Sequence, residues 1–172
     1  MATLIQATDG NLYGTTEFGG AYGYGTLFKI TPSGTLTTLH NFCNLNASPS
    51  CPDGGFPIMG LVQATNGDLY GTTQGDADDN AGYGAIFRIS LGLAPFVETQ
   101  TTSGTVGAAV KILGTDLTGA TSVTFNGTAA TFTVVSASEI TTTVPTGATT
   151  GLVEVTTPGG TLKSNKNFTV TL

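Results

Sequence analysis

Charged side chains are scarce in this chain, at 9 % of its 172 residues, and tryptophan is absent. The five Lys and Arg residues are spread along the sequence and are outnumbered by eleven Asp and Glu, which gives a formal charge of −6. Binding to phosphate backbones needs a clustered basic surface, so we expect no nucleic-acid partner. No run of 18 apolar residues occurs either, and we expect no membrane insertion.

Cysteine is also rare, and Cys43 and Cys51 are the two in the chain. They flank a short polar loop in which prolines and glycines can turn the backbone, so we predict a local disulfide. Two free thiols are the alternative, and a zinc site is the least favoured because it needs more ligands. A disulfide places the protein outside the cytosol, in the extracellular space or at the cell surface. Residues 1–6 lack the pattern of a signal peptide.

What the chain does contain favours β structure. Threonine is abundant and glycine occurs 25 times, a composition typical of β-branched strands and turns rather than helices. With 39 % hydrophobic residues the chain can bury a core, so its low charge does not indicate disorder. We predict an all-β fold in one medium domain or two small ones.

The first half of the sequence contains two copies of one pattern. Residues 4–16, LIQATDGNLYGTT, recur as residues 61–73, LVQATNGDLYGTT, with ten of thirteen positions identical. Residues 23–31, GYGTLFKIT, recur as residues 82–90, GYGAIFRIS, so the spacing grows from 57 to 59. Repeats of this length are typical of propeller blades and related arrays.

Turn residues divide each copy into strands. Asp9-Gly10 and Asn66-Gly67 stand between short apolar stretches, and such pairs predict type I′ hairpins with positive φ. Strands at 26–31 and 35–40 follow, joined by a turn with Gly34 in the left-handed conformation. Four strands make a blade-like meander, and the second copy stops after its third strand. Fewer than two blades cannot close a ring, which leaves a fragment of a longer array, self-association, or a two-unit sheet with exposed edges.

Between residues 4 and 90 these motifs form a recognisable set: two LYGTT boxes, the stretch GYGTLFKITPSG, a cysteine-containing loop with DGGFP, and the restart GLVQATNGDLYGTT. The set resembles the Gloeo/Verruco (GloVer) repeat. The resemblance implies two repeats over residues 1–93, the second incomplete, with a propeller-like fold. It also implies a place in an exported, repeat-rich bacterial protein.

The composition changes at residues 91–95, where we place a linker. Beyond it, pairs of apolar residues mark at least six short strands, and most pairs are two positions apart and so share one strand face. The pairs are Val110 and Ile112, Val123 and Phe125, Phe132 and Val134, Ile140 and Val144, Val153 and Val155, and Phe168 and Val170. They predict an antiparallel sandwich over residues 94–172.

Several segments of residues 94–172 resemble the IPT/TIG family of immunoglobulin-like domains, among them SGTVG at 103–107, VKILG at 110–114 and ATSVTFNG at 120–127. The resemblance implies an immunoglobulin-like β-sandwich that serves as an extracellular spacer or binding module. Leu117 stands where an aromatic residue is common, which is expected to thin the core slightly. The DNA-binding role of some members is not carried over, because three lysines are the only bases in this half.

No motif indicates catalysis. His40 is the single histidine, and no Gly-x-Ser-x-Gly elbow accompanies it as a Ser-His-Asp device would require. Glu17, Glu98, Glu139 and Glu154 are scattered rather than paired for glycoside hydrolysis. We therefore predict no catalytic residues and no enzymatic activity.

Asp76, Asp78 and Asn80 form the densest cluster of oxygen ligands, at the first, third and fifth positions of a calcium loop. Ala81 and Phe87 stand where an EF-hand needs Gly and Glu, so that motif is excluded. An irregular Ca²⁺ site is the remaining hypothesis, and a solvated loop insertion is the alternative. We expect no other cofactor.

The glycine-rich segment 19–25 lacks the Lys-Ser/Thr of a phosphate loop. Its glycines predict a tight loop that leaves Tyr22 and Tyr24 as stacking surfaces for a sugar. Packing of these tyrosines between neighbouring repeats is the alternative.

These observations together favour a non-enzymatic scaffold, adhesion or ligand-binding module of an exported bacterial repeat protein. The alternative is the accessory portion of a polysaccharide-acting enzyme whose catalytic domain lies elsewhere. The expected partners are a polysaccharide or a cell-surface protein, together with further repeats of the same array or a second copy of the chain.

Overall fold

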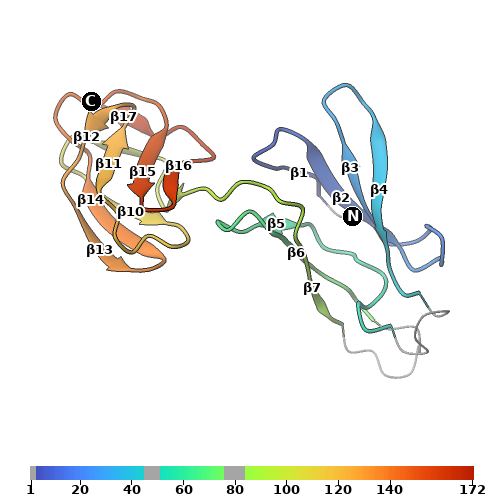
Figure 1. The fold of residues 1–172 in the computed structure, drawn as a ribbon. Helices are drawn as coiled ribbons and strands as arrows, with labels where there is room; N and C mark the ends of the chain where they lie inside the picture. Colours follow the sequence, from blue (N-terminus) through green and yellow to red (C-terminus); the bar gives the residue numbers. More distant parts are fainter. Residues whose placement is uncertain (1–2, 45–50, 76–83) are drawn as a thin grey trace. The chain divides into compact units, whose positions relative to one another are not determined.

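The computed structural model divides into two compact units, Met1–Leu93 and Ala94–Leu172. It describes residues 3–44, 51–75 and 84–172 (Figure 1). Within these residues every regular element is a strand, and no sheet closes into a barrel. The all-β prediction is confirmed. The same residues contain no helix long and apolar enough to cross a membrane.

The first unit contains two meanders, one for each copy of the sequence repeat. Repeat 1 is a four-stranded antiparallel sheet in the order β1-β2-β3-β4, formed by Ile5–Gln6, Leu12–Thr16, Thr26–Ile30 and Leu36–Asn41. Repeat 2 is a three-stranded antiparallel sheet in the order β5-β6-β7, formed by Val62–Gln63, Leu69–Thr72 and Ile86–Ile89. In the described residues, repeat 2 therefore has three strands where repeat 1 has four.

The hairpin that opens each repeat differs from the prediction. In repeat 1 the N–H of Ala7 donates to the Asn11 carbonyl at 3.0 Å, and the N–H of Gly10 donates to the Ala7 carbonyl at 2.9 Å. Gly10 has a φ of 79°, while Asp9 does not adopt positive φ. The connection is a three-residue loop with glycine last, and the predicted type I′ turn is wrong here and at Asn66-Gly67. The cause is local: Asp9 Oδ1 accepts the N–H of Asn11 at 3.1 Å, which stabilises an Asx turn.

The glycine of each LYGTT box lies opposite a phenylalanine on the neighbouring strand, Gly14 opposite Phe28 and Gly71 opposite Phe87. A Cβ at Gly14 would lie 2.9 Å from the Phe28 ring, and one at Gly71 would overlap the Phe87 ring. The rings thus cover the glycines directly, and no larger residue fits without moving them.

The second unit is a sandwich of two antiparallel four-stranded sheets (Figure 1). One sheet has the order β13-β14-β10-β8 and comprises Phe132–Ser136, Glu139–Thr143, Ala109–Leu113 and Glu98–Thr99. The other has the order β12-β11-β15-β16 and comprises Thr128–Ala129, Ser122–Phe125, Val153–Thr157 and Gly160–Lys163. A parallel pair joins β9, Ser103–Thr105, to β17, Thr169–Thr171.

One hydrophobic core fills this sandwich, as the alternating pattern predicts. Its buried members are Val97, Val110, Ile112, Leu117, Val123, Phe125, Ile140, Val144, Val153, Val155 and Phe168. The ring of Phe125 meets that of Phe168 edge-on, with centroids 5.2 Å apart. Leu117 is fully buried and packs over Gly114, where a Cβ would lie 2.8 Å from its Cδ2 atom.

Candidate functional site

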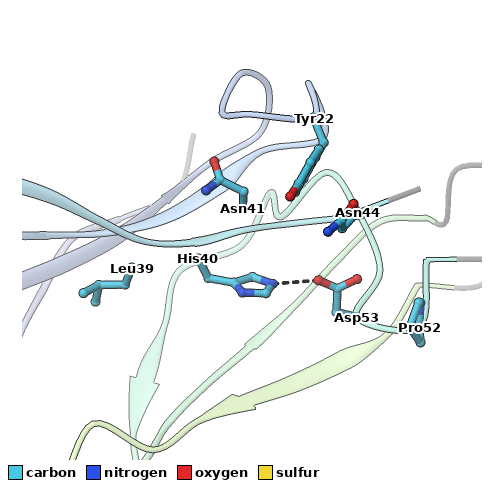
Figure 2. A pocket seen from close by; sticks show the side chains of 7 residues that line it. All are labelled: Tyr22, Leu39, His40, Asn41, Asn44, Pro52 and Asp53. Carbon is cyan, nitrogen blue, oxygen red and sulfur yellow. Dashed lines mark hydrogen bonds and ion pairs between the residues drawn. The ribbon is translucent and has the colours of Figure 1, made fainter. Parts of the chain in front are cut away.

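An open pocket of about 440 Å³ lies at the end of strand β4 in the first unit (Figure 2). Its lining is mainly polar, and none of the described lining residues is a lysine or an arginine. The lining residues are Tyr22, Leu39, His40, Asn41, Asn44, Pro52 and Asp53. Three of them are consecutive at the end of β4, and the others come from the loop before β3 and from the segments around the cysteines.

His40 and Asp53 form the central polar pair of the pocket (Figure 2). The distance from His40 Nε2 to Asp53 Oδ2 is 2.6 Å. An ionised carboxylate only accepts hydrogen bonds, so Nε2 carries the proton and a neutral ring leaves Nδ1 as an acceptor. Asp53 also accepts the backbone N–H of Cys43, at 3.3 Å to Oδ1 and 3.4 Å to Oδ2.

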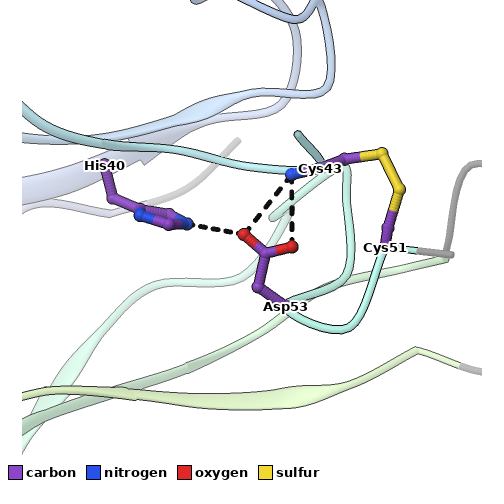
Figure 3. The surroundings of a disulfide bond; sticks show 4 residues. All are labelled: His40, Cys43, Cys51 and Asp53. Carbon is purple, nitrogen blue, oxygen red and sulfur yellow. Dashed lines mark hydrogen bonds and ion pairs between the residues drawn. A yellow bond between two sulfur atoms is a disulfide. The ribbon is translucent and has the colours of Figure 1, made fainter. Parts of the chain in front are cut away.

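The disulfide between Cys43 and Cys51 closes the loop beside this pair (Figure 3). The two Cα atoms are 4.6 Å apart and both residues are buried. The prediction of a local disulfide is confirmed. Cys43 has a φ of 60°, a left-handed conformation that costs a non-glycine residue free energy and that the bridge helps to hold. The bridge therefore links the segment that ends β4 to the segment that carries Asp53.

Aromatic packing joins the pocket to the core of the first unit. The ring of His40 lies edge-on to Phe42, with centroids 4.9 Å apart. Phe42 is buried and lies edge-on to Phe87 of repeat 2, also at 4.9 Å. The imidazole is thus held by Asp53 on one side and by a packed ring on another.

The two tyrosines singled out from the sequence have different surroundings. Tyr22 is half-buried and lines the pocket (Figure 2). Tyr24 packs against Phe56, with ring centroids 5.3 Å apart, and its side chain lies over Gly55. Tyr24 therefore packs against the segment that connects the two sheets, and its packing between neighbouring repeats stays a prediction. A stacking role for Tyr22 stays a prediction.

The calcium hypothesis rests on Asp76, Asp78 and Asn80, and these three lie outside the described residues. Among residues 3–44, 51–75 and 84–172, no group of three or more His, Cys, Asp or Glu side chains is placed to hold a metal ion.

A second polar cluster lies in the opening hairpin of repeat 1. Asp9 Oδ2 accepts hydrogen bonds from Asn11 Nδ2 at 2.6 Å and from the Tyr13 hydroxyl at 2.9 Å. Burial acts to raise the pKa of Asp9, but the hydrogen bonds from Asn11 and Tyr13 outweigh it and hold that pKa below its usual value. Burial and the bond to Asp9 raise the pKa of Tyr13 to about 12. We assign this cluster a structural role, because Tyr13 belongs to the buried core of the unit.

Asp53 was not among the candidates that the sequence suggested. Its distance of 13 positions from His40 matches no short motif. The signal lies in its position two residues after Cys51, because a predicted bridge to Cys43 already places the segment beside the end of β4.

The fold and the pocket define a class: a tandem β-repeat unit with a disulfide-closed polar pocket, followed by a β-sandwich. The family model described as the Gloeobacter/Verrucomicrobia repeat matches residues 1–150, and the chain belongs to this family. The resemblance of the repeat segment is confirmed, and the match runs beyond residue 93 into the second unit. The resemblance of residues 94–172 to the IPT/TIG family stays a prediction.

No curated protein matches the chain. Among solved structures, it is similar to a structure described as "Novel fungal alcohol oxidase with catalytic diversity among the AA5 family, in complex with copper", at 13 % identity and a TM-score of 0.36. The alignment covers 99 % of this chain and 42 % of the oxidase chain, so the present chain spans less than half of that protein. A similarity this low supports no functional argument.

Proposed function

We propose that the chain is a non-enzymatic, extracellular binding module that holds a neutral saccharide in the pocket beside His40 and Asp53. The observation that carries the proposal is the composition of the lining: one tyrosine ring, two asparagine amides, an imidazole and a carboxylate. Sugar hydroxyls both donate and accept hydrogen bonds, and the apolar face of a sugar ring suits an exposed aromatic face.

The charge of the pocket favours a neutral ligand over an anionic one. Among the described lining residues Asp53 is the one carboxylate, and none is a lysine or an arginine. A phosphate or sulfate group placed beside Asp53 would meet a like charge without a compensating cation.

The same lining favours binding over catalysis. His40 and Asp53 form an imidazole–carboxylate pair like that of a hydrolytic triad, but Asp53 bonds Nε2, whereas the carboxylate of the triad bonds Nδ1. A nucleophile is the third member of such a device, and none of the described lining residues is a serine, a threonine or a cysteine. The disulfide supports an extracellular location, because such bonds persist in oxidising compartments.

Retention on insoluble cellulose, chitin and xylan tests the proposal. We expect the protein to be retained on at least one of the three. Tyr22→Ala should abolish retention, and Tyr22→Phe should preserve it because the ring face remains. Val135→Ala, at an exposed position of the second unit, is the matched control. The proposal is overturned if the protein binds none of the three polysaccharides, or if Tyr22→Ala is retained as well as the control.

A further inference from the structure

Each repeat of the first unit has two apolar faces, because alternate residues of a strand point to opposite sides. We call the one that carries Leu4, Leu12 and Phe28 the leucine face, and its counterparts in repeat 2 are Leu61, Leu69 and Phe87. We call the other the tyrosine face. It carries Ile5, Tyr13 and Leu27 in repeat 1, and Val62, Tyr70 and Ile86 in repeat 2.

Inside the chain, the tyrosine face of repeat 1 packs against the leucine face of repeat 2. One core cluster contains Tyr13 and Leu27 from the former and Leu61, Leu69 and Phe87 from the latter. Hydrogen bonds flank this interface. Gln63 Oε1 accepts the N–H of Thr8 at 3.0 Å, and Gln63 Nε2 donates to Thr8 Oγ1 at 3.0 Å.

In the described residues the two remaining faces are less buried than the two that meet inside the chain. Leu27 is fully buried, whereas Ile86, its counterpart in repeat 2, is 80 % exposed. Leu61 is 6 % exposed, whereas Leu4, its counterpart in repeat 1, is 49 % exposed. The tyrosine face is thus buried in repeat 1 but exposes Ile86 in repeat 2. The leucine face is buried in repeat 2 but exposes Leu4 in repeat 1.

We propose that the tyrosine face of repeat 2 docks onto the leucine face of repeat 1 in a second copy of this chain. The internal interface is the template for this contact, because there a tyrosine face packs against a leucine face in one core cluster. The polar residues beside the internal interface recur at the proposed one. Gln6 of repeat 1 corresponds to Gln63 of repeat 2, and Thr65 of repeat 2 corresponds to Thr8 of repeat 1. This surface is separate from the saccharide pocket of the proposed function.

The geometry of the contact makes a specific assembly. The two faces that meet are different, so the contact is heterologous, and a pair of copies retains one unused face of each kind, the leucine face on one copy and the tyrosine face on the other. Heterologous contacts grow into rings or open chains rather than stopping at a two-fold dimer. The mass of the assembly should therefore increase with protein concentration.

Sedimentation velocity of the full chain over a range of concentrations tests the proposal. Wild-type protein should form species beyond a dimer. Ile86→Lys, at an exposed position of the tyrosine face, and Leu4→Lys, whose aliphatic stem can still cover Gly14, should each reduce the protein to a monomer. Val135→Lys, an exposed apolar position of the second unit, should associate as wild type does.

A mixture of the two monomeric variants gives the sharpest outcome. Each variant keeps one intact face, so the equimolar mixture should form a dimer and nothing larger. A wild type that stays monomeric at its highest soluble concentration overturns the proposal, as does unchanged association of Ile86→Lys. A mixture that stays monomeric also overturns it. Val62→Lys provides a second block of the tyrosine face at an exposed position.

Discussion

Asn66 occupies in repeat 2 the turn position that Asp9 occupies in repeat 1, and each side chain accepts the backbone N–H of the residue two positions further on. The distances are 3.1 Å from the N–H of Asn11 to Asp9 Oδ1 and 3.0 Å from the N–H of Asp68 to Asn66 Oδ1. The turn therefore accepts either residue. What distinguishes Asp9 is its charge, which the Tyr13 hydroxyl and the Asn11 amide stabilise.

Asp9→Asn should lower stability at neutral pH and lose this effect in acid. The pKa of Asp9 is depressed in the folded state, so its contribution is present above the unfolded value of 3.8. The contribution disappears as the pH falls through the folded pKa. Urea denaturation from pH 6 down to pH 2 measures it, and the difference between variant and wild type should shrink steadily toward pH 2. A difference that grows in acid would contradict the assignment.

Alkaline titration should reveal one tyrosine that ionises late. The pKa of Tyr13 is raised to about 12, so stability from its protonated hydroxyl is fully present below pH 10 and is lost toward pH 12. Absorbance at 295 nm should show a step near pH 12 that Tyr13→Phe removes. Tyr22→Phe is the control and should retain the step.

Removal of the disulfide should weaken the pocket as well as the fold. A bridge that closes a loop of this length contributes about 2.5 kcal/mol to the free energy of unfolding in the chain-entropy model. Cys43→Ala with Cys51→Ala should lower the urea midpoint accordingly. Loss of the bridge also frees the backbone N–H of Cys43 from Asp53, so retention on polysaccharide should fall. Full retention by the double variant would show that the bridge does not organise the pocket.

Gly71→Ala should destabilise the first unit by about 1 to 3 kcal/mol, because the new methyl group overlaps the Phe87 ring. The matched control is Gly75→Ala, where no atom of the described part of the chain lies within 4 Å of the new group. Phe87→Leu in the Gly71→Ala background should recover part of the loss. Chemical denaturation measures all three, and equal stability of Gly71→Ala and Gly75→Ala would disprove the overlap.

Local chemistry in the sequence predicted much of the fold. Gly34 closes its turn with a φ of 91°, as its place after Pro32 and Ser33 indicates. The disulfide joins two cysteines flanked by turn residues. Such features depend on a few neighbouring residues, and those are fully visible in the sequence.

The features that the sequence did not predict depend on competing local hydrogen bonds or on contacts between residues far apart in the sequence. Asp9-Gly10 suits a type I′ turn by composition, but the Asp9 side chain stabilises another turn. A type I′ turn needs positive φ at two consecutive residues. Asn126 and Gly127, between β11 and β12, meet this condition, with φ of 46° and 84°.

The pairing of His40 with Asp53 depends on the disulfide, which brings Asp53 beside the end of β4, while the spacing of 13 positions by itself matches no motif. Leu27 and Ile86 hold equivalent positions in the two repeats but differ in burial. Leu27 is buried because its face packs against repeat 2, whereas Ile86 lies on a face that no described residue covers in this way.

The parallel pair of β9 and β17 affects how the second unit responds to tension. Thr169, Val170 and Thr171 lie beside Ser103, Gly104 and Thr105 in the same direction. A pull on the chain before β9 and after β17 would slide the two strands past each other. The hydrogen bonds between them would then share the load at once instead of parting one by one like a zipper. A spacer on a cell surface would gain mechanical resistance from this short ladder.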